Sequence, residues 1–144
     1  MPTRNASAVW EGGLQGGKGN FTGESGGIGG AYSFGSRFAE GKGSNPEELL
    51  AAAEAACYSM ALSGALEKAG MNPTRVETRA ACTVEKQGAG FTITTMKLQV
   101  TATVPNADEA KFREIAQATK DAKSGCPVSR ALAGVEISVD ARLA

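Results

Sequence analysis

The chain has 144 residues, the length of one ordinary domain, and its 15 basic and 15 acidic side chains leave it without net charge. Without an excess of positive charge there is no basic surface for a phosphate backbone, which argues against a dedicated nucleic-acid-binding protein. The sequence contains no histidine, which excludes Ser-His-Asp triads, Cys-His dyads and metal sites built on imidazole. Any catalysis must therefore depend on cysteine, arginine, lysine or carboxylates.

The N-terminus and the cysteine count indicate the compartment. The first residues, MPTRNAS, are not followed by an apolar run, and no stretch approaches the roughly 20 consecutive apolar residues of a membrane helix. Three cysteines, an odd number, do not fit a secreted disulfide framework. We therefore expect a soluble cytoplasmic protein, without a membrane partner, whose thiols are free to react.

The first third of the chain is rich in glycine, which favours short strands joined by turns. Residues 12–30 read GGLQGGKGNFTGESGGIGG. Glycine supplies the positive φ that tight turns need, whereas it weakens strand interiors. The pattern predicts three strands, over Ala6–Glu11, Gly17–Glu24 and roughly Ala31–Arg37.

A long helix is predicted next. Asn45 suits an N-cap, Pro46 suits the first helical position, and Gly70 ends the run that follows. Small side chains recur in this run at helical spacing and would let another backbone approach closely, so we expect the helix to be buried in the middle of the fold. The stripe consists of Leu49, Ala52, Ala53, Ala56, Cys57, Met60, Ser63 and Gly64.

The remaining elements complete an α+β pattern. Two strands around a turn at residues 87–90 alternate apolar and polar residues, Asp108–Ala122 has the pattern of a helix, and Gly134–Leu143 alternates strictly. The order of three strands, helix, two strands, helix and strand predicts a single α+β domain over residues 1–144, with mostly antiparallel sheets around the long helix. The inward face of the two central strands is predicted to carry Val76, Thr78, Ala80, Cys82 and Val84, with Met96, Leu98, Val100, Ala102 and Val104.

The three cysteines lie in different settings. Cys82 falls on the apolar face of a predicted strand, where a cysteine behaves as a small hydrophobic residue. Cys126 precedes Pro127 and a predicted short helix over Val128–Leu132, a place where backbone amides favour a thiolate. By itself this pattern leaves open whether Cys126 is reactive or inert.

Cys57 lies in the middle of the predicted long helix, far from either end. A thiol in this position needs a cation to ionise, and taken in isolation it could equally be a core residue. Glu54, three residues earlier, would disfavour a thiolate if it faced the same way, so we expect its side chain to point elsewhere.

Two long motifs make the chain similar to a known family. They surround Cys57 and Cys126, which are 69 residues apart. Together they resemble the OsmC/Ohr family of thiol-dependent organic hydroperoxide reductases, and in particular its OsmC branch. The motifs read NPEELL from Asn45, AACYSMAL from Ala55 and SGCPVS from Ser124, with shorter similarities at WEG from Trp10, GKG from Gly17, RF from Arg37 and AGF from Ala89.

The resemblance implies an activity and a set of site residues. Cys57 resembles the peroxidatic cysteine, whose thiolate attacks the peroxide O–O bond, and Cys126 resembles the resolving cysteine, which condenses with the sulfenic acid to a disulfide. Arg37 and Glu47 resemble the pair that activates and gates the thiol. The resemblance further implies an OsmC-like intertwined homodimer with active sites at its interface, an organic hydroperoxide as substrate, and a dithiol reductant, for which the wider family suggests a lipoyl dithiol. It implies no cofactor and no metal, and a role in oxidative or osmotic stress defence.

Such a site has no need of histidine. A guanidinium is always charged and can both hold a thiolate and polarise a peroxide, and Glu47 would fix the position of Arg37. Ten residues separate Glu47 from Cys57, about 15 Å along a continuous helix, so this carboxylate cannot reach the sulfur in the same helix. Either Arg37 spans the gap or the pair acts on the partner chain. Our hypothesis is that Arg37 and Glu47 act in trans.

Apolar residues around the motifs favour alkyl or fatty-acid hydroperoxides over hydrogen peroxide. Two alternatives stay open. One is a non-enzymatic redox-sensing stress protein of the same fold. The other is a cysteine-ligated metal protein, for which three widely spaced thiols without histidine are a poor ligand set. The candidate lining residues are Phe34, Phe38, Leu49, Leu50, Tyr58 and Met60.

Overall fold

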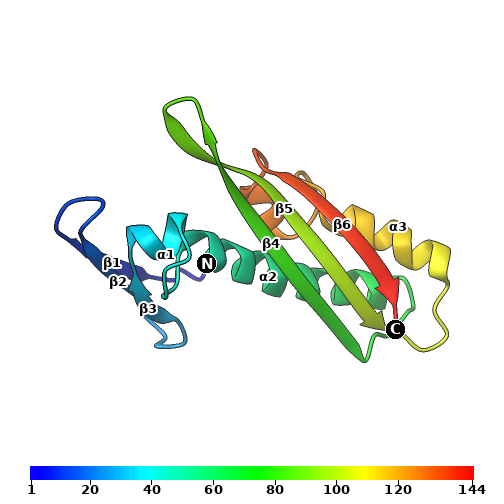
Figure 1. Ribbon diagram of the computed structural model, residues 1–144. Helices are drawn as coiled ribbons and strands as arrows, with labels where there is room; N and C mark the ends of the chain where they lie inside the picture. Colours follow the sequence, from blue (N-terminus) through cyan, green and yellow to red (C-terminus); the bar gives the residue numbers. More distant parts are fainter. The chain divides into compact units, whose positions relative to one another are not determined.

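The computed structural model describes the whole chain, residues 1–144, as two compact units (Figure 1). Unit 1 is Met1–Leu49 and unit 2 is Leu50–Ala144. Unit 1 holds a small glycine-rich sheet and a short helix, and unit 2 holds a larger sheet with helices packed on it. The elements make this an α+β protein, as predicted. The single domain over residues 1–144 stays a prediction.

Unit 1 contains a three-stranded antiparallel sheet. Its strands pair in the order β1 (Ala6–Glu11), β2 (Lys18–Gly23) and β3 (Gly29–Tyr32). The rings of Trp10 and Tyr32 pack on it with their centroids 5.4 Å apart. A Cβ on Gly19 would collide with both rings. Glycine is therefore needed at the point where the two rings cover the sheet.

The prediction of a strand over Ala31–Arg37 was wrong after Tyr32. Strand β3 ends there, and helix α1 (Phe34–Phe38) follows. The Ser33 Oγ accepts a hydrogen bond from the Ser36 N–H at 3.1 Å, and the Ser36 Oγ accepts one from the Ser33 N–H at 2.9 Å. This reciprocal cap starts a helix through local bonds. It was missed because the usual signature has Glu or Gln, and not Ser, at the third helical position.

Helix α2 (Pro46–Lys68) begins and ends where the sequence predicts. The Asn45 Oδ1 accepts a hydrogen bond from a backbone N–H of the first turn at 2.7 Å. At the other end Gly70 has a φ of 79°, and the Met71 N–H donates to the Leu66 carbonyl at 2.9 Å. This is the bond pattern of a Schellman motif, in which glycine adopts the left-handed conformation without strain.

Unit 2 is built on a mixed three-stranded sheet, with β5 in the centre (Figure 1). Strand β4 (Arg75–Gln87) pairs antiparallel with β5 (Gly90–Thr103), and β6 (Glu136–Leu143) pairs parallel with β5. The predicted faces are confirmed, because Met96 and Leu98 of β5 are buried and Cys82 of β4 packs against the same core. The parallel pairing of β6 needs a crossover, which contains helices α3 (Glu109–Thr119) and α4 (Pro127–Ala131).

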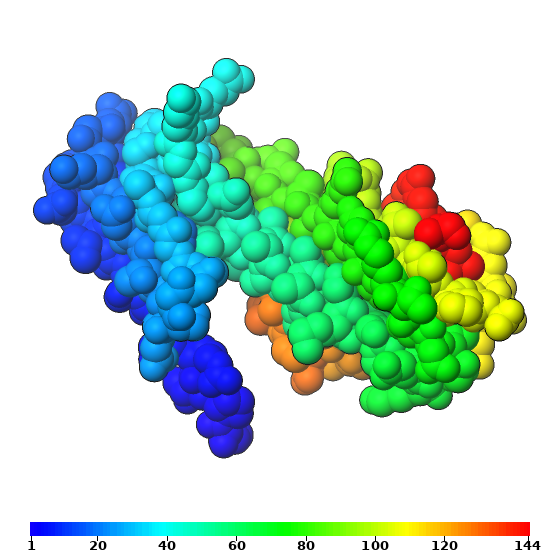
Figure 2. All heavy atoms as spheres, turned by 90° about the horizontal axis from the view of Figure 1, so that it is seen from below, coloured from blue at the N-terminus to red at the C-terminus, as the bar shows by residue number.

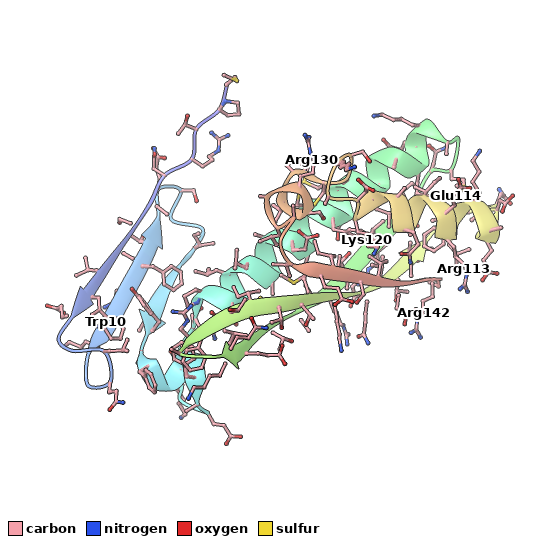
Figure 3. All side chains as sticks on the ribbon, turned by 90° about the horizontal axis from the view of Figure 1, so that it is seen from above. Trp10, Arg113, Glu114, Lys120, Arg130 and Arg142 are labelled. Carbon is pink, nitrogen blue, oxygen red and sulfur yellow. The ribbon has the colours of Figure 1, made fainter.

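Helix α3 lies beside β6 and is bound to it through side chains. The Gln117 Nε2 donates to the Val139 carbonyl, and the Lys120 Nζ donates to the Ile137 carbonyl, each at 2.8 Å. Figure 3 labels Lys120 on the helix that lies beside β6. These bonds satisfy backbone acceptors on the open edge of β6, which would otherwise face solvent or another chain. They hold the crossover in place, including the loop that leads to Cys126.

One face of α2 packs into the core of unit 2. The buried core includes Tyr58, Leu62 and Leu66 of α2, Met96, Leu98 and Val100 of β5, and Phe112 and Ala116 of α3. The stripe of small residues is not this face, contrary to expectation. Ala52, Ala53 and Ala56 are exposed, and Met60 is 79% exposed. Burial of large side chains gains more free energy than burial of alanine, so the bulky face is the one that meets the sheet.

Part of α2 is visible at the surface in Figure 2, beside the orange segment that contains α4. By length and composition alone, the 23 residues of α2 are long and apolar enough to cross a membrane, which was not expected from the sequence. The core helix of a soluble protein meets the same criterion. In this structure Tyr58, Leu62 and Leu66 pack against the sheet, so these apolar residues of α2 belong to the protein core.

Candidate active site

Cys57 and Cys126 come together in unit 2. Cys57 lies on α2, and Cys126 is the N-cap of α4, as the sequence predicts. The two thiols are within hydrogen-bonding reach of each other. After α3 the chain turns back tightly, with the Gly125 N–H donating to the Asp121 carbonyl at 2.7 Å and the Cys126 N–H donating to the Thr119 carbonyl at 3.0 Å. These backbone bonds determine where the second sulfur lies.

The first turn of α4 directs backbone amides at both sulfurs. The Val128 N–H donates to the Cys57 sulfur. The Ser129 N–H donates to the Cys126 Sγ at 3.3 Å, and the Ser129 Oγ lies 3.2 Å from the same sulfur. Because these amides have no partner within the helix, they are free to bind the two thiols.

Glu54 belongs to this site, and the expectation that it points elsewhere was wrong. Its side chain is fully buried. The Ser129 Oγ donates to the Glu54 Oε1 at 2.5 Å, and the Cys126 Sγ lies 3.9 Å from both carboxylate oxygens. Spacing along the helix could have revealed this, because Glu54, Tyr58 and Leu62 recur every four residues and therefore share one buried stripe.

Burial is the largest of the influences that together raise the pKa of the Cys57 thiol to about 11. The Cys126 thiol and the Glu54 carboxylate also raise this pKa, whereas the hydrogen bond from the Val128 N–H lowers it. None of these influences is a cation. A thiolate is the reactive form of cysteine, so these surroundings keep Cys57 protonated and unreactive at neutral pH.

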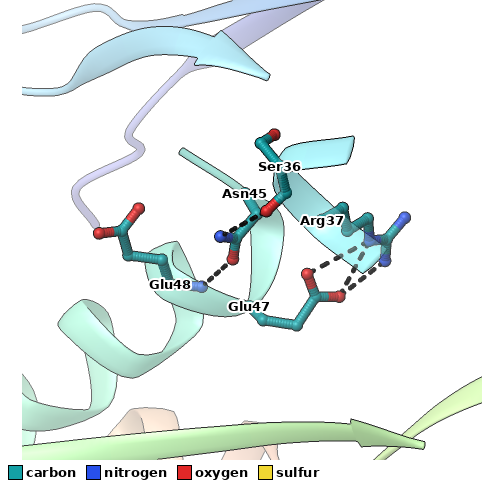
Figure 4. A network of polar contacts seen from close by, with 5 residues as sticks. All are labelled: Ser36, Arg37, Asn45, Glu47 and Glu48. Atoms are coloured by element: carbon teal, nitrogen blue, oxygen red, sulfur yellow. Dashed lines mark hydrogen bonds and ion pairs between the residues drawn. The ribbon is translucent and has the colours of Figure 1, made fainter. Parts of the chain in front are cut away.

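Arg37 and Glu47 form an ion pair within unit 1 (Figure 4). The Arg37 Nε and Nη2 donate to the Glu47 Oε1 at 3.0 and 2.8 Å. Glu47 is buried, whereas the Arg37 side chain is 38% exposed and its Nη1 takes no part in the pair. The guanidinium therefore keeps donors for a further ligand. The action of this pair on Cys57 stays a prediction.

The pair is anchored at the start of α2. The Asn45 side-chain amide donates to the Ser36 carbonyl at 3.3 Å while its Oδ1 caps α2 (Figure 4). Asn45 therefore connects the helix that carries Arg37 with the helix that carries Glu47. This explains how one asparagine in the NPEELL motif can serve both the helix start and the ion pair.

A groove of about 680 Å³ opens beside Cys126 in unit 2. Its walls come from α2, α3 and the segment before α4, and include Met60, Gly64 and Ile115, with Lys68 and Lys111 also among the lining residues. Of the predicted lining residues, Met60 lies in the wall of this groove. Tyr58 is not, because it is fully buried and its hydroxyl donates to the Ala116 carbonyl at 2.7 Å.

Cys82 is separate from this chemistry. It lies on β4 opposite Met96 and packs partly buried against the hydrophobic core, as predicted. No group of three or more Cys, Asp or Glu side chains in the chain is arranged to hold a metal ion. The arrangement in unit 2 is thus a pair of free thiols with a buried carboxylate, a site suited to reversible thiol oxidation.

Comparisons with known proteins agree with this geometry. The family model described as OsmC-like protein matches residues 39–140. Peroxiredoxin OsmC of Escherichia coli (strain K12) is 45% identical over 141 residues, which cover 97% of this chain and 96% of that protein.

Solved structures share the fold at lower identity. The organic hydroperoxide resistance protein OhrB of Bacillus subtilis is 23% identical with a TM-score of 0.70, covering 96% of this chain and 98% of that one. An organic hydroperoxide resistance protein OsmC from Legionella pneumophila is 19% identical with a TM-score of 0.70, covering 98% of each chain. These two likenesses concern the fold.

Proposed function

Because the chain belongs to the OsmC-like protein family, we propose that it is a peroxidase that reduces organic hydroperoxides to alcohols with its own cysteines, in defence against oxidative or osmotic stress. The observation that carries this proposal is the contact between the Cys57 and Cys126 thiols where α2 meets α4. Two free thiols within reach of each other can be oxidised to a disulfide and reduced again, which is the cycle that a two-cysteine peroxidase needs.

The reaction runs in three steps. The Cys57 thiolate attacks one oxygen of the hydroperoxide, the O–O bond breaks, and the alkoxide takes a proton to leave as the alcohol. Cys57 is now a sulfenic acid, and the Cys126 thiol condenses with it to form a disulfide and water. An external dithiol, which we propose to be of the lipoyl type, then reduces the disulfide by thiol–disulfide exchange.

Arg37 is proposed to activate Cys57. The surroundings of Cys57 raise the pKa of its thiol, so a reaction at neutral pH needs a cation near the sulfur. A guanidinium meets this need and also offers donors to a peroxide oxygen. The bidentate bond to buried Glu47 would hold Arg37 in one rotamer, which supports a positioning role for Glu47.

The proposed working form is a homodimer in the cytoplasm, with the active sites at its interface. The exposed small-residue face of α2, with Met60 79% exposed, supports the dimer, because small side chains let two helix backbones approach closely. The apolar groove beside Cys126 supports alkyl or fatty-acid hydroperoxides as substrates, since an apolar chain gains free energy there and hydrogen peroxide gains little.

Two cysteine variants test the proposed function. With cumene hydroperoxide and a lipoyl dithiol, the wild type is expected to turn over repeatedly. Cys57→Ser should lose turnover completely, because it has no peroxidatic sulfur. Without the dithiol, Cys126→Ser should consume about one equivalent and then hold a sulfenic acid on Cys57, which dimedone labels. Peptide mapping by mass spectrometry identifies the labelled residue and the disulfide in the wild type.

Cys82→Ser is the matched control, since this third thiol packs against the core on β4 and should leave turnover intact. Turnover that survives in Cys57→Ser would overturn the proposal. A wild type that is oxidised once and is not reduced by any dithiol would instead indicate a redox sensor of the same fold.

A further inference from the structure

We propose that Glu54 is the acid–base residue of the second step: it takes the proton from the Cys126 thiol while the Cys57–Cys126 disulfide forms. This inference rests on the proposed peroxidase cycle. It adds Glu54 to the residues that already have a role in that cycle, which are the two cysteines, Arg37 and Glu47. It follows from a buried cluster of three side chains, Glu54 on α2 with Cys126 and Ser129 at the start of α4.

Contacts within the cluster form a path for a proton. The Cys126 Sγ lies 3.9 Å from each oxygen of the Glu54 carboxylate, within hydrogen-bonding distance for sulfur. The Ser129 Oγ lies 3.2 Å from the same sulfur and donates to the Glu54 Oε1 at 2.5 Å. The proton of Cys126 can therefore reach the carboxylate directly or through the serine hydroxyl.

Geometry places Glu54 to act as a base on Cys126. Glu54 is fully buried, and burial of a carboxylate is costly unless hydrogen bonds compensate it. The Ser129 hydroxyl supplies such a bond at 2.5 Å, and the Cys126 thiol lies against the same carboxylate. A buried carboxylate in direct contact with the thiol that must lose its proton meets the geometric requirement for a general base.

Core packing alone does not explain this residue. A helix that only packs on a sheet would carry an apolar side chain at this point, as it does one turn later at Tyr58 and two turns later at Leu62. Glu54 also raises the pKa of the Cys57 thiol, so it works against the first step of the cycle. Glu54 opposes the first step but contacts the thiol that acts in the second step. A role in the second step therefore explains why a glutamate lies at this position.

Atoms and charges balance in the proposed step. The proton of the Cys126 thiol moves to Glu54, and the Cys126 sulfur forms a bond with the Cys57 sulfur. The S–O bond of the Cys57 sulfenic acid breaks, and its hydroxide leaves. Glu54 returns the proton to this hydroxide, which becomes water, and the carboxylate is restored. Both sulfurs end in the disulfide, and Glu54 is unchanged over the cycle.

Glu54→Gln and Glu54→Asp separate this role from a structural one. Glutamine keeps the size of the side chain and an acceptor for Ser129 but cannot take a proton, whereas aspartate keeps the carboxylate on a shorter side chain. After one equivalent of cumene hydroperoxide, samples are quenched at intervals and mapped for sulfenic acid and disulfide. Disulfide formation in Glu54→Gln should be slower than in the wild type by about 10²-fold, the usual effect of losing a general base.

Sulfenic acid should form in Glu54→Gln at least as fast as in the wild type, because the charge that disfavours the Cys57 thiolate is gone. Glu54→Asp should resolve faster than Glu54→Gln. A structural role predicts the reverse order, because glutamine preserves the packing and aspartate does not. Glu67→Gln, an exposed position on the same helix, is the matched control and should behave as the wild type.

The role of Glu54 and the proposed function can fail separately. If the wild type consumes the hydroperoxide and Glu54→Gln forms the disulfide equally fast, the role of Glu54 is overturned while the peroxidase stands. If the wild type does not consume it, the proposed function itself fails. Should Glu54→Gln not fold, Glu54→Met provides the test, since it also cannot take a proton and is an apolar side chain of similar length beside the buried Tyr58 and Leu62. Disulfide formation in Glu54→Met as fast as in the wild type would contradict the proposal.

Discussion

Cys57 shows how strongly a reactive residue depends on its neighbours. Desolvation, the second thiol and the Glu54 carboxylate together raise the pKa of its thiol to about 11, even though a backbone N–H opposes them. At pH 7 a thiol with such a pKa is thiolate in only about one molecule in 10⁴. A positive charge near the sulfur would lower this pKa and raise the share of thiolate.

Replacement of Arg37 tests whether its guanidinium is that charge. In Arg37→Met the rate of sulfenic acid formation at pH 7 should fall by about 10- to 10³-fold, since an adjacent cation lowers a thiol pKa by about 1–3 units. Because thiolate forms only as the pH approaches the pKa, the rate should then rise with pH up to about 11. Rapid mixing with cumene hydroperoxide across the pH range measures this.

Arg130→Met is the matched control, because Arg130 is exposed and lies in the last turn of α4. Its pH profile should match that of the wild type. If Arg37→Met reacts with the wild-type profile, Arg37 does not activate Cys57, and another cation must be sought.

At the scale of elements, the turn between α3 and α4 decides where Cys126 lies. Gly125 sits against backbone atoms, so that a Cβ on it would clash with the Thr119 carbonyl and with both the amide nitrogen and the carbonyl of Asp121. Backbone atoms cannot move aside as the end of a side chain can. The glycine of the SGCPVS motif is therefore needed for close packing, next to the cysteine that α4 presents.

Gly125→Ala should weaken both the fold and the second chemical step. The clash should lower the free energy of unfolding by about 1–3 kcal/mol, the usual cost of overpacking. It should also slow disulfide formation, because the N-cap cysteine is displaced from Cys57. Urea unfolding and the single-turnover disulfide assay provide the two measurements.

Gly134→Ala serves as the comparison, since a Cβ there has no heavy atom within 4 Å. Its free energy of unfolding should stay within about 0.5 kcal/mol of the wild type. Equal stabilities for the two alanine variants would mean that the turn before α4 relaxes easily and that Gly125 is not required for close packing.

At the scale of the whole molecule, α2 has two faces with different tasks. The bulky face packs on the sheet of unit 2, and the small-residue face, with Met60 79% exposed, is uncovered in the single chain. An exposed stripe of alanine and methionine on a central helix is the kind of surface that a second copy covers. The proposed homodimer would use this face and bring the active sites to the interface.

Complementation tests whether Arg37 acts across that interface. Equal amounts of Cys57→Ser and Arg37→Ala chains, co-refolded, should recover about a quarter of the wild-type turnover, because half of the dimers are mixed and each holds one intact site. Each variant alone should be inactive or nearly so. Peroxidase assays on the whole mixture measure this recovery, and mixed dimers isolated through two different tags should show about half of the wild-type turnover.

Met60→Glu in both chains places charges on the exposed face of α2, so the dimer should not form. Sedimentation should then show monomers, and the recovery of turnover should be abolished. Leu14→Glu, at an equally open turn position, should leave the dimer intact. Mixed dimers that form but stay inactive would show that Arg37 acts within its own chain.

The features that follow from short stretches of chain were predictable from the sequence. Asn45 and Gly70 mark the ends of α2, the alternation around Cys82 predicts its place on the apolar face of its strand, and Cys126 lies at the N-cap of α4. Caps and periodic patterns act over a few residues, so they can be read from the order of the residues alone. The identity of the candidate thiols also came from this level, through their motifs.

Contacts between distant segments of the chain were decided only by the tertiary structure. The meeting of Cys57 with Cys126, the contact of Glu54 with Cys126, and the choice of the bulky face of α2 over the small one depend on how the sheet and the α3–α4 crossover pack. A helix pattern states which residues share a face, but the surface that this face meets belongs to other parts of the chain. The spacing along α2 puts Glu54 on the same stripe as Tyr58 and Leu62, whereas its contact with the second thiol is a product of packing.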